Sequence, residues 1–156
     1  MTSEYGTLEI HDGVKVLRYE RRLRHPVDRV WRALTEPAEL RGWLADADLD
    51  PAPGGRVELR WLNTDDEGNR AVARGTVARW ELEPEGDGAT RLTLTVEHGT
   101  LPDEYVTKVR AGWHIHLEHL EAALDGEPVD WERWNEEHLP RWKEIEARYS
   151  AQQTIA

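Results

Sequence analysis

Residues 103–124 have the sequence DEYVTKVRAGWHIHLEHLEAAL, and their apolar positions recur with the period of a helix. The apolar side chains that fall within about 60° of one another on a helical wheel are Val106, Trp113, Leu117, Leu120 and Leu124. Asp125-Gly126 follows as a helix end, and Pro128 lies just beyond it. We therefore predict a long amphipathic helix from Asp103 to Leu124 that covers another layer with one face.

The segments before this helix alternate between apolar and polar side chains, which is typical of strands. One face of each predicted strand carries Leu17, Tyr19, Arg21 and Leu23 in 14–24, Val57, Leu59 and Trp61 in 56–62, and Leu92, Leu94, Val96 and His98 in 91–98. Residues 70–82 predict one long strand or two. Short turns join these segments, so we expect an antiparallel sheet packed against the helix in a two-layer α+β domain.

Two short helices are predicted after the first strand. Pro26 opens one helix, whose apolar stripe includes Val30 and Trp31. Thr35 is expected to cap the second, which has Pro37 in its first turn and leads to Trp43. We expect both Trp31 and Trp43 to lie in the core.

The chain after this domain is rich in tryptophan. Residues 130–149 favour a helix interrupted at Pro140, and residues 150–156 are expected to fray. This segment contains Trp131, Trp134, Trp142, Ile145 and Tyr149. We therefore predict a domain over 1–128 and a helical extension over 129–156. The extension either folds back on its own domain or forms a homodimer contact through residues 129–149.

Composition narrows the classes of protein and partner. The 156 residues carry a net charge of -11 and include no cysteine, which excludes disulfides and thiolate chemistry. The net charge is -1 over residues 1–80 and -10 over residues 81–156, so nucleic acid is not an expected partner. No apolar run is long enough for a membrane span, and Met1 to Asp12 lacks a signal-peptide pattern, so we expect a cytoplasmic protein.

Several motifs together resemble a known superfamily. Residues 22–37, RLRHPVDRVWRALTEP, followed by Trp43, are similar to the N-terminal signature of the START-like (SRPBCC) superfamily. One branch is indicated by Pro53-Gly54-Gly55, by Arg79-Trp80-Glu81-Leu82 before Gly86-Asp87-Gly88, and by Ala111-Gly112-Trp113-His114. That branch resembles the C-terminal domain of the activator of the heat-shock-protein-90 ATPase. The similarity extends from about Val14 to Gly126.

The resemblance implies a helix-grip fold, in which a curved antiparallel sheet wraps the C-terminal helix and encloses a cavity. Relatives bind lipids, aromatic polyketides or other apolar molecules there, and some act as cyclases. Relatives usually carry an additional Pro-Pro segment and strand between the equivalents of Gly75-Thr76-Val77 and Arg79-Trp80-Glu81-Leu82. Here these motifs are nearly contiguous, so we expect the sheet to be shorter by a strand or a hairpin.

The predicted inward faces define a candidate ligand site. The residues expected to line it are Tyr19, Leu59, Trp61, Trp80, His98, Trp113, His116 and Leu117. The three indoles favour a flat aromatic ligand if they surround a space, and a closed core if they fill it. The two histidines could bind a ligand carbonyl, transfer a proton, or serve only as hydrogen-bonded core residues. Arg21 could neutralise a ligand carboxylate, or form an ion pair with a nearby Glu or Asp.

Evidence for a metal or a nucleophile is weak in the sequence. His116 and His119 have i, i+3 spacing, but His114 points away and no further ligand is marked, so we expect partly exposed histidines and no metal or cofactor. The only serines, Ser3 and Ser150, lie near the ends, and no catalytic serine motif is present.

Three functions remain open. The first is the binding of a small apolar or aromatic molecule. The second is a cyclase or hydratase-like enzyme with His116 or His98 as general base. The third is a protein-interaction domain, by analogy with the chaperone activator.

Overall fold

The computed structural model describes residues 5–50, 52, 54–62, 72–76, 79–86, 88–98 and 102–154, with the backbone alone for residues 72–76, 98, 153 and 154. The strands are β1 (Thr7–His11), β2 (Val14–Leu23), β3 (Asp46–Leu49), β4 (Arg56–Arg60), β5 (Val72–Thr76), β6 (Arg79–Glu85) and β7 (Ala89–His98). The helices are α1 (Val27–Thr35), α2 (Pro37–Leu40), α3 (Asp103–Leu124), the short 3-10 helix η1 (Trp131–Arg133), α4 (Trp134–Glu137) and α5 (Leu139–Thr154). The α+β class and the bounds of the long helix are as predicted.

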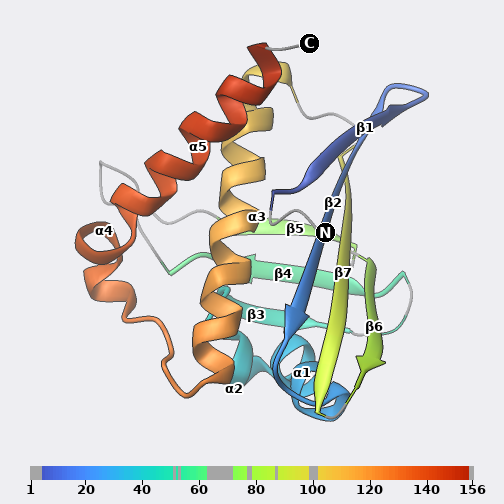
Figure 1. Ribbon diagram of the computed structural model, residues 1–156, viewed down its shortest axis with the longest axis vertical. Helices are drawn as coiled ribbons and strands as arrows, with labels where there is room; N and C mark the ends of the chain where they lie inside the picture. Colours follow the sequence, from blue (N-terminus) through green and yellow to red (C-terminus); the bar gives the residue numbers. More distant parts are fainter. Residues whose placement is uncertain are drawn as a thin grey trace.

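The strands form two antiparallel sheets, whose strands cross in Figure 1. One has the order β1-β2-β7-β6, with Arg21 opposite Leu92 and Trp80 opposite Leu94. The other has the order β3-β4-β5. Thr76 and Arg79 therefore belong to different sheets, and the nearly contiguous motifs of the sequence mark the passage from one sheet to the other.

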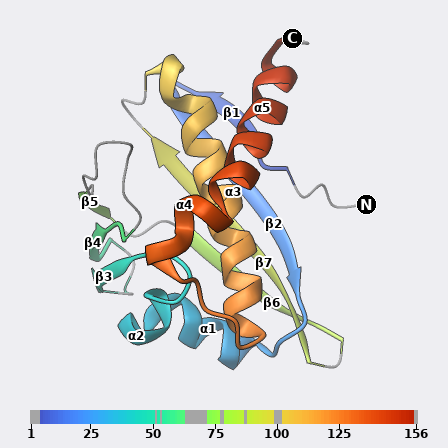
Figure 2. The same ribbon diagram turned by 90° about the vertical axis from the view of Figure 1, so that its left-hand side faces the viewer.

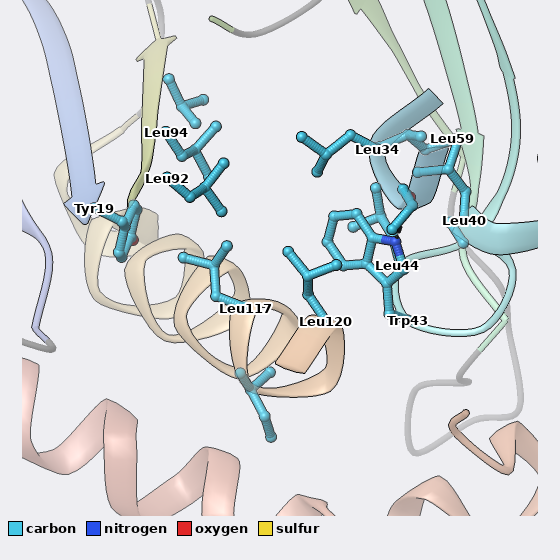
Figure 3. Close-up of a cluster of buried hydrophobic side chains, with 14 of the residues drawn as sticks. Tyr19, Leu34, Leu40, Trp43, Leu44, Leu59, Leu92, Leu94, Leu117 and Leu120 are labelled. Carbon is cyan, nitrogen blue, oxygen red and sulfur yellow. Dashed lines mark hydrogen bonds between the residues drawn. The ribbon is translucent and has the colours of Figure 1, made fainter. Parts of the chain in front are cut away.

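The helix α3 lies between the inner faces of the two sheets and buries the predicted apolar stripe. In Figure 3, Tyr19, Leu92 and Leu94 approach α3 from the four-stranded sheet, and Leu34, Leu40, Trp43, Leu44 and Leu59 approach from the other side. Leu117 and Leu120 lie between the two groups and are almost fully buried. Antiparallel strands that curve around the long helix α3 form the helix-grip arrangement expected from the sequence.

The two short helices form after the prolines that predicted them, but two details of the prediction are wrong. Thr35 does not cap α2, because its hydroxyl donates to the carbonyl of Trp31 at 2.8 Å and Glu36 occupies the position before Pro37. Trp31 does not lie in the core: 48% of its surface is exposed, because α1 turns Val30 and Leu34 inward instead.

The C-terminal helices pack on the side of α3 that faces away from the four-stranded sheet (Figure 2). Pro140 lies in the first turn of α5, where its missing N–H costs nothing, so the helical segment breaks at His138 rather than at Pro140. The helix continues to Thr154, so the expected fraying from residue 150 is wrong up to that point. Ile145 and Tyr149 of α5 are fully buried.

A hydrogen-bonded chain fastens α5 to α3 and to the N-terminal segment. The backbone N–H of Gly6 donates to the hydroxyl of Tyr149 at 2.8 Å, and this hydroxyl lies 2.8 Å from Nδ1 of His114. Because the Tyr149 oxygen accepts from Gly6, its own proton is available to donate to His114. Gly6 comes so close to Tyr19 that a Cβ atom there would overlap the Tyr19 ring. Glycine is therefore required at the point where the N-terminal segment meets the core.

Replacing Tyr149 with phenylalanine is expected to lower the free energy of unfolding by about 2–4 kcal/mol, because Gly6 N–H and His114 Nδ1 both lose a buried partner. Urea unfolding followed by far-ultraviolet circular dichroism measures this loss. The matched control is Tyr105→Phe, since Tyr105 is 49% exposed; there the change should stay within about 0.5 kcal/mol. Equal stability of the Tyr149→Phe and wild-type proteins would contradict the role of this chain.

None of the helices in the described part of the chain is long and apolar enough to cross a membrane.

Candidate functional site

Three indoles meet edge to face between the sheets and α3. The ring of Trp80 on β6 lies 6.1 Å from that of Trp43, which follows α2, and 6.4 Å from that of Trp113 on α3. Trp43 is fully buried, whereas Trp80 and Trp113 are half-buried. The interplanar angles of 84° and 73° are those that the quadrupoles of aromatic rings favour. Trp43 thus forms the inner end of an aromatic row whose other members keep part of their surface uncovered.

A second aromatic contact lies further along the same side of α3. The ring of Trp61, which directly follows β4, stacks on the imidazole of His116 at 5.2 Å and 27°. The His116 ring also lies 6.1 Å from that of Trp131 and 5.6 Å from that of His119. Trp61 is half-buried, and His116 is buried. The structure therefore places Trp61 with His116, and Trp80 with Trp113.

The hydrogen bond of His116 determines which of its nitrogens carries the proton. Nδ1 lies 3.0 Å from the backbone carbonyl of Trp43, which can only accept, so Nδ1 carries the proton and Nε2 has a free lone pair. Burial lowers the pKa of His116 to about 4, and the carbonyl of Trp43 offsets only part of this effect. At neutral pH the ring is uncharged and offers an acceptor at Nε2, which makes no hydrogen bond to the described residues.

The other predicted lining residues occupy the core or the end of a strand. Leu59 and Leu117 are buried among core side chains. Tyr19 is also buried, and its hydroxyl donates to the carbonyl of Arg110 at 2.9 Å. His98 ends β7 opposite Lys15, and its side chain lies outside the described part of the structure.

The prediction of partly exposed histidines on α3 is wrong, because different segments cover them. Tyr149 of α5 covers His114, Trp134 of α4 covers His119, and Trp43 and Trp61 lie against His116. His114, His116 and His119 are all buried, with 1%, 6% and 4% of their surface exposed. The indole N–H of Trp134 donates to Nε2 of His119 at 3.0 Å, so Nε2 is unprotonated. Burial lowers the pKa of both His114 and His119 to about 3. Among the described residues, no group of three or more His, Asp or Glu side chains has a geometry that could hold a metal.

Sequence reasoning missed the part that Trp131 takes in this region. Its ring approaches His116 and His119, both at 6.1 Å, and its N–H donates to the carbonyl of Arg41 at 2.6 Å. The abundance of indoles in the extension was the available signal, but helical periodicity does not say which earlier residue each one contacts. The extension therefore contributes to the surroundings of His116.

Comparison with known proteins places this geometry in context. Residues 24–80 match the family model described as Activator of Hsp90 ATPase homolog 1-like protein. The predicted resemblance is confirmed. The region that resembles the activator homologues contains α1, α2, Trp43 and Trp61, and it ends at Trp80. None of the curated proteins compared with the chain matches it.

Solved structures share the fold over three quarters of the chain or more. CalU16 from Micromonospora echinospora is 19% identical, with 94% of each chain covered and a TM-score of 0.59. NE0264 from Nitrosomonas europaea is 27% identical, over 76% of this chain and 98% of that one, with a TM-score of 0.59. EF2215 from Enterococcus faecalis, described as a conserved protein of unknown function, is 17% identical, over 96% of this chain and 91% of that one, with a TM-score of 0.66. These likenesses establish the helix-grip fold, which is consistent with ligand-binding domains in general.

Proposed function

We propose that this protein binds a small, flat, apolar or aromatic molecule between its sheets and α3. One observation carries the proposal: Trp61 stacks on His116 and Trp80 meets Trp113, yet each of the three indoles stays only half-buried. Indoles that simply filled a core would be buried as Trp43 is. Ligand sites are typically lined by aromatic side chains with a few polar groups that fix orientation.

His116 supplies such a polar group. Its Nε2 lone pair would accept a hydrogen bond from a hydroxyl or N–H group of a ligand lying against Trp61. A ligand with an aromatic ring and one donor at its edge matches this pair. The carbonyl of Trp43 orients the imidazole, so the acceptor is already in place before binding.

The same histidine is poorly suited to catalysis. A general base works best when its pKa lies near the working pH, whereas the pKa of His116 is about 4. A base this weak gains little driving force for removing a proton from carbon or water. We therefore favour binding over a cyclase or hydratase-like activity.

Titration with the neutral probe N-phenyl-1-naphthylamine tests the proposal. We expect the probe to become fluorescent and to quench the tryptophan emission with one saturable transition. The Trp113→Leu variant should bind about tenfold more weakly, because loss of one indole contact costs roughly 1–2 kcal/mol. Circular dichroism should show that the variant remains folded.

Trp142→Leu is the matched control, because Trp142 is also half-buried but lies on α5. This variant should bind the probe as the wild type does. Absence of saturable binding to the wild-type protein would overturn the proposal, as would equal weakening in both variants.

A further inference from the structure

Two arginine side chains are buried near Tyr149, in the region where β2, α3 and α5 meet. Arg21 of β2 is 9% exposed, and Arg110 of α3 is 5% exposed. Neither guanidinium has a carboxylate within 4 Å among the described residues. In the described part of the chain Arg21 therefore has no ion pair, because the strand turns this side chain inward beside Tyr19 and Leu23 and away from the charged surface.

The hydrogen bonds of the two guanidiniums leave donors unused. Arg21 Nη1 donates to the backbone carbonyl of Glu20 at 2.8 Å, and Arg21 Nη2 is buried without an acceptor. Arg110 Nη2 donates to the carbonyl of Gly6 at 2.8 Å and lies 3.4 Å from Oε1 of Gln152. Arg110 Nε is buried without an acceptor, and the guanidinium carbon lies 4.3 Å from the centre of the Tyr149 ring. Neutral acceptors thus bind only some of the N–H donors of each guanidinium group.

Both positive charges act on the same neighbours. Arg21 and Arg110 each lower the pKa of the hydroxyl groups of Tyr19 and Tyr149, against a larger opposing effect of burial. Arg21 also contributes to the lowered pKa of His114, which lies one helical turn beyond Arg110. The two guanidiniums therefore share one region between β2, α3 and α5.

The carboxylate of Glu118, which lies near His114, is already paired. Glu118 accepts from Nε of Arg141 at 2.9 Å and 3.2 Å, and it also lies 3.9 Å from His114. Burial lowers the pKa of Arg110, which reflects the cost of holding an uncompensated charge away from water. The region carries two positive charges, unused N–H donors and no available carboxylate among the described residues.

We propose that a small oxyanion, a carboxylate or phosphate group, binds between Arg21 and Arg110. Arg21 Nη2 and Arg110 Nε would donate to its oxygens, in the charge-assisted manner that guanidinium groups favour. Neither guanidinium is among the side chains proposed to contact the apolar ligand, so this site does not depend on that ligand.

The test compares anions at constant ionic strength and pH 7. When sodium acetate or sodium phosphate replaces sodium chloride, we expect the Tm of the wild-type protein to rise by about 2–4 °C and to level off. The two anions show whether a carboxylate or a phosphate is preferred. The Nε–H resonance of Arg110, observed by ¹⁵N NMR, should shift with the same saturation curve, which gives a readout that needs no substitution at Arg110.

Arg21→Gln should weaken the anion affinity at least tenfold. Arg22→Gln is the matched control, because Arg22 lies on the opposite face of β2 and pairs with Glu85 at the surface. The proposal is overturned if neither anion moves the Tm or the Arg110 resonance, or if Arg21→Gln responds as the wild type does.

Discussion

Replacing Trp43 with alanine is expected to lower the free energy of unfolding by about 3–5 kcal/mol, the largest effect we expect from a single substitution. Trp43 is fully buried, and its indole N–H donates to the carbonyl of Ala33 at 2.8 Å. The substitution opens a cavity beside Trp80 and leaves the carbonyl of Ala33 without its donor. Urea unfolding measures the loss.

Trp31→Ala is the control, because it removes a tryptophan side chain from an exposed position. The same side chain is removed twelve positions earlier, but Trp31 is 48% exposed and the cost should stay below about 1 kcal/mol. Losses of similar size in the two variants would contradict the assignment of Trp43, and not Trp31, to the core. Loss of probe binding in Trp43→Ala should accompany the loss of stability, because Trp43 holds both Trp80 and His116.

Acidification is expected to destabilise the protein steeply between about pH 6.5 and pH 5. The pKa values of His114, His116 and His119 lie at about 3, 4 and 3 in the folded protein, below the ordinary value of 6.5 that applies to the unfolded chain. As the pH falls through 6.5, the unfolded chain takes up protons that the folded protein cannot accept, so the free energy of unfolding decreases. Each histidine lowers the free energy of unfolding by up to about 1.4 kcal/mol per pH unit, and the three together lower it by up to about 4 kcal/mol per pH unit.

The neighbouring charges strengthen this expectation. Arg21 and Arg141 act on His114, and His116 and His138 act on His119, so each of these neighbours opposes protonation when it is charged. The bond from Trp134 N–H to His119 Nε2 also requires an unprotonated nitrogen. The stability contributed by the neutral rings is therefore fully present above about pH 6.5 and is lost toward their folded pKa values.

Urea unfolding at several pH values between 7.5 and 5 measures the slope. His119→Gln retains an acceptor for Trp134 but does not titrate, so its slope should be about one third smaller. His11→Gln is the control, because His11 is exposed and its slope should equal that of the wild type. A constant free energy of unfolding from pH 7.5 to pH 5 would show that these histidines are not buried in neutral form.

Local sequence predicted the elements that bury a regular apolar face. Helix α3 has the predicted bounds, and the alternation of β2 correctly placed Leu17, Tyr19, Arg21 and Leu23 inward. Two strands were not predicted, for a physical reason. TLEIH of β1 and DADL of β3 both alternate, but each segment has only two apolar positions, and β1 is mostly exposed. Alternation this short does not identify a strand.

The candidate site was predictable only in part. Helical and strand periodicity predicted that Trp61, Trp80, Trp113 and His116 share the inner side of the fold. It could not predict that Trp61 pairs with His116, because that contact joins residues far apart in the sequence. It also assigned Trp31 to the core, since an apolar stripe on a short helix does not reveal how wide the buried face is.

The amino-acid sequence determined the layers of this protein, because side-chain periodicity and proline positions act over a few residues. The tertiary structure decided which of its polar side chains are charged and which have partners. The three histidines of α3 become neutral, and Arg21 has no ion pair among the described residues, because the packing of β2, α3 and the C-terminal helices buries them. These side chains lose contact with water because segments more than a hundred residues apart pack together, as Gly6 and Tyr149 do. A local sequence pattern does not indicate such contacts.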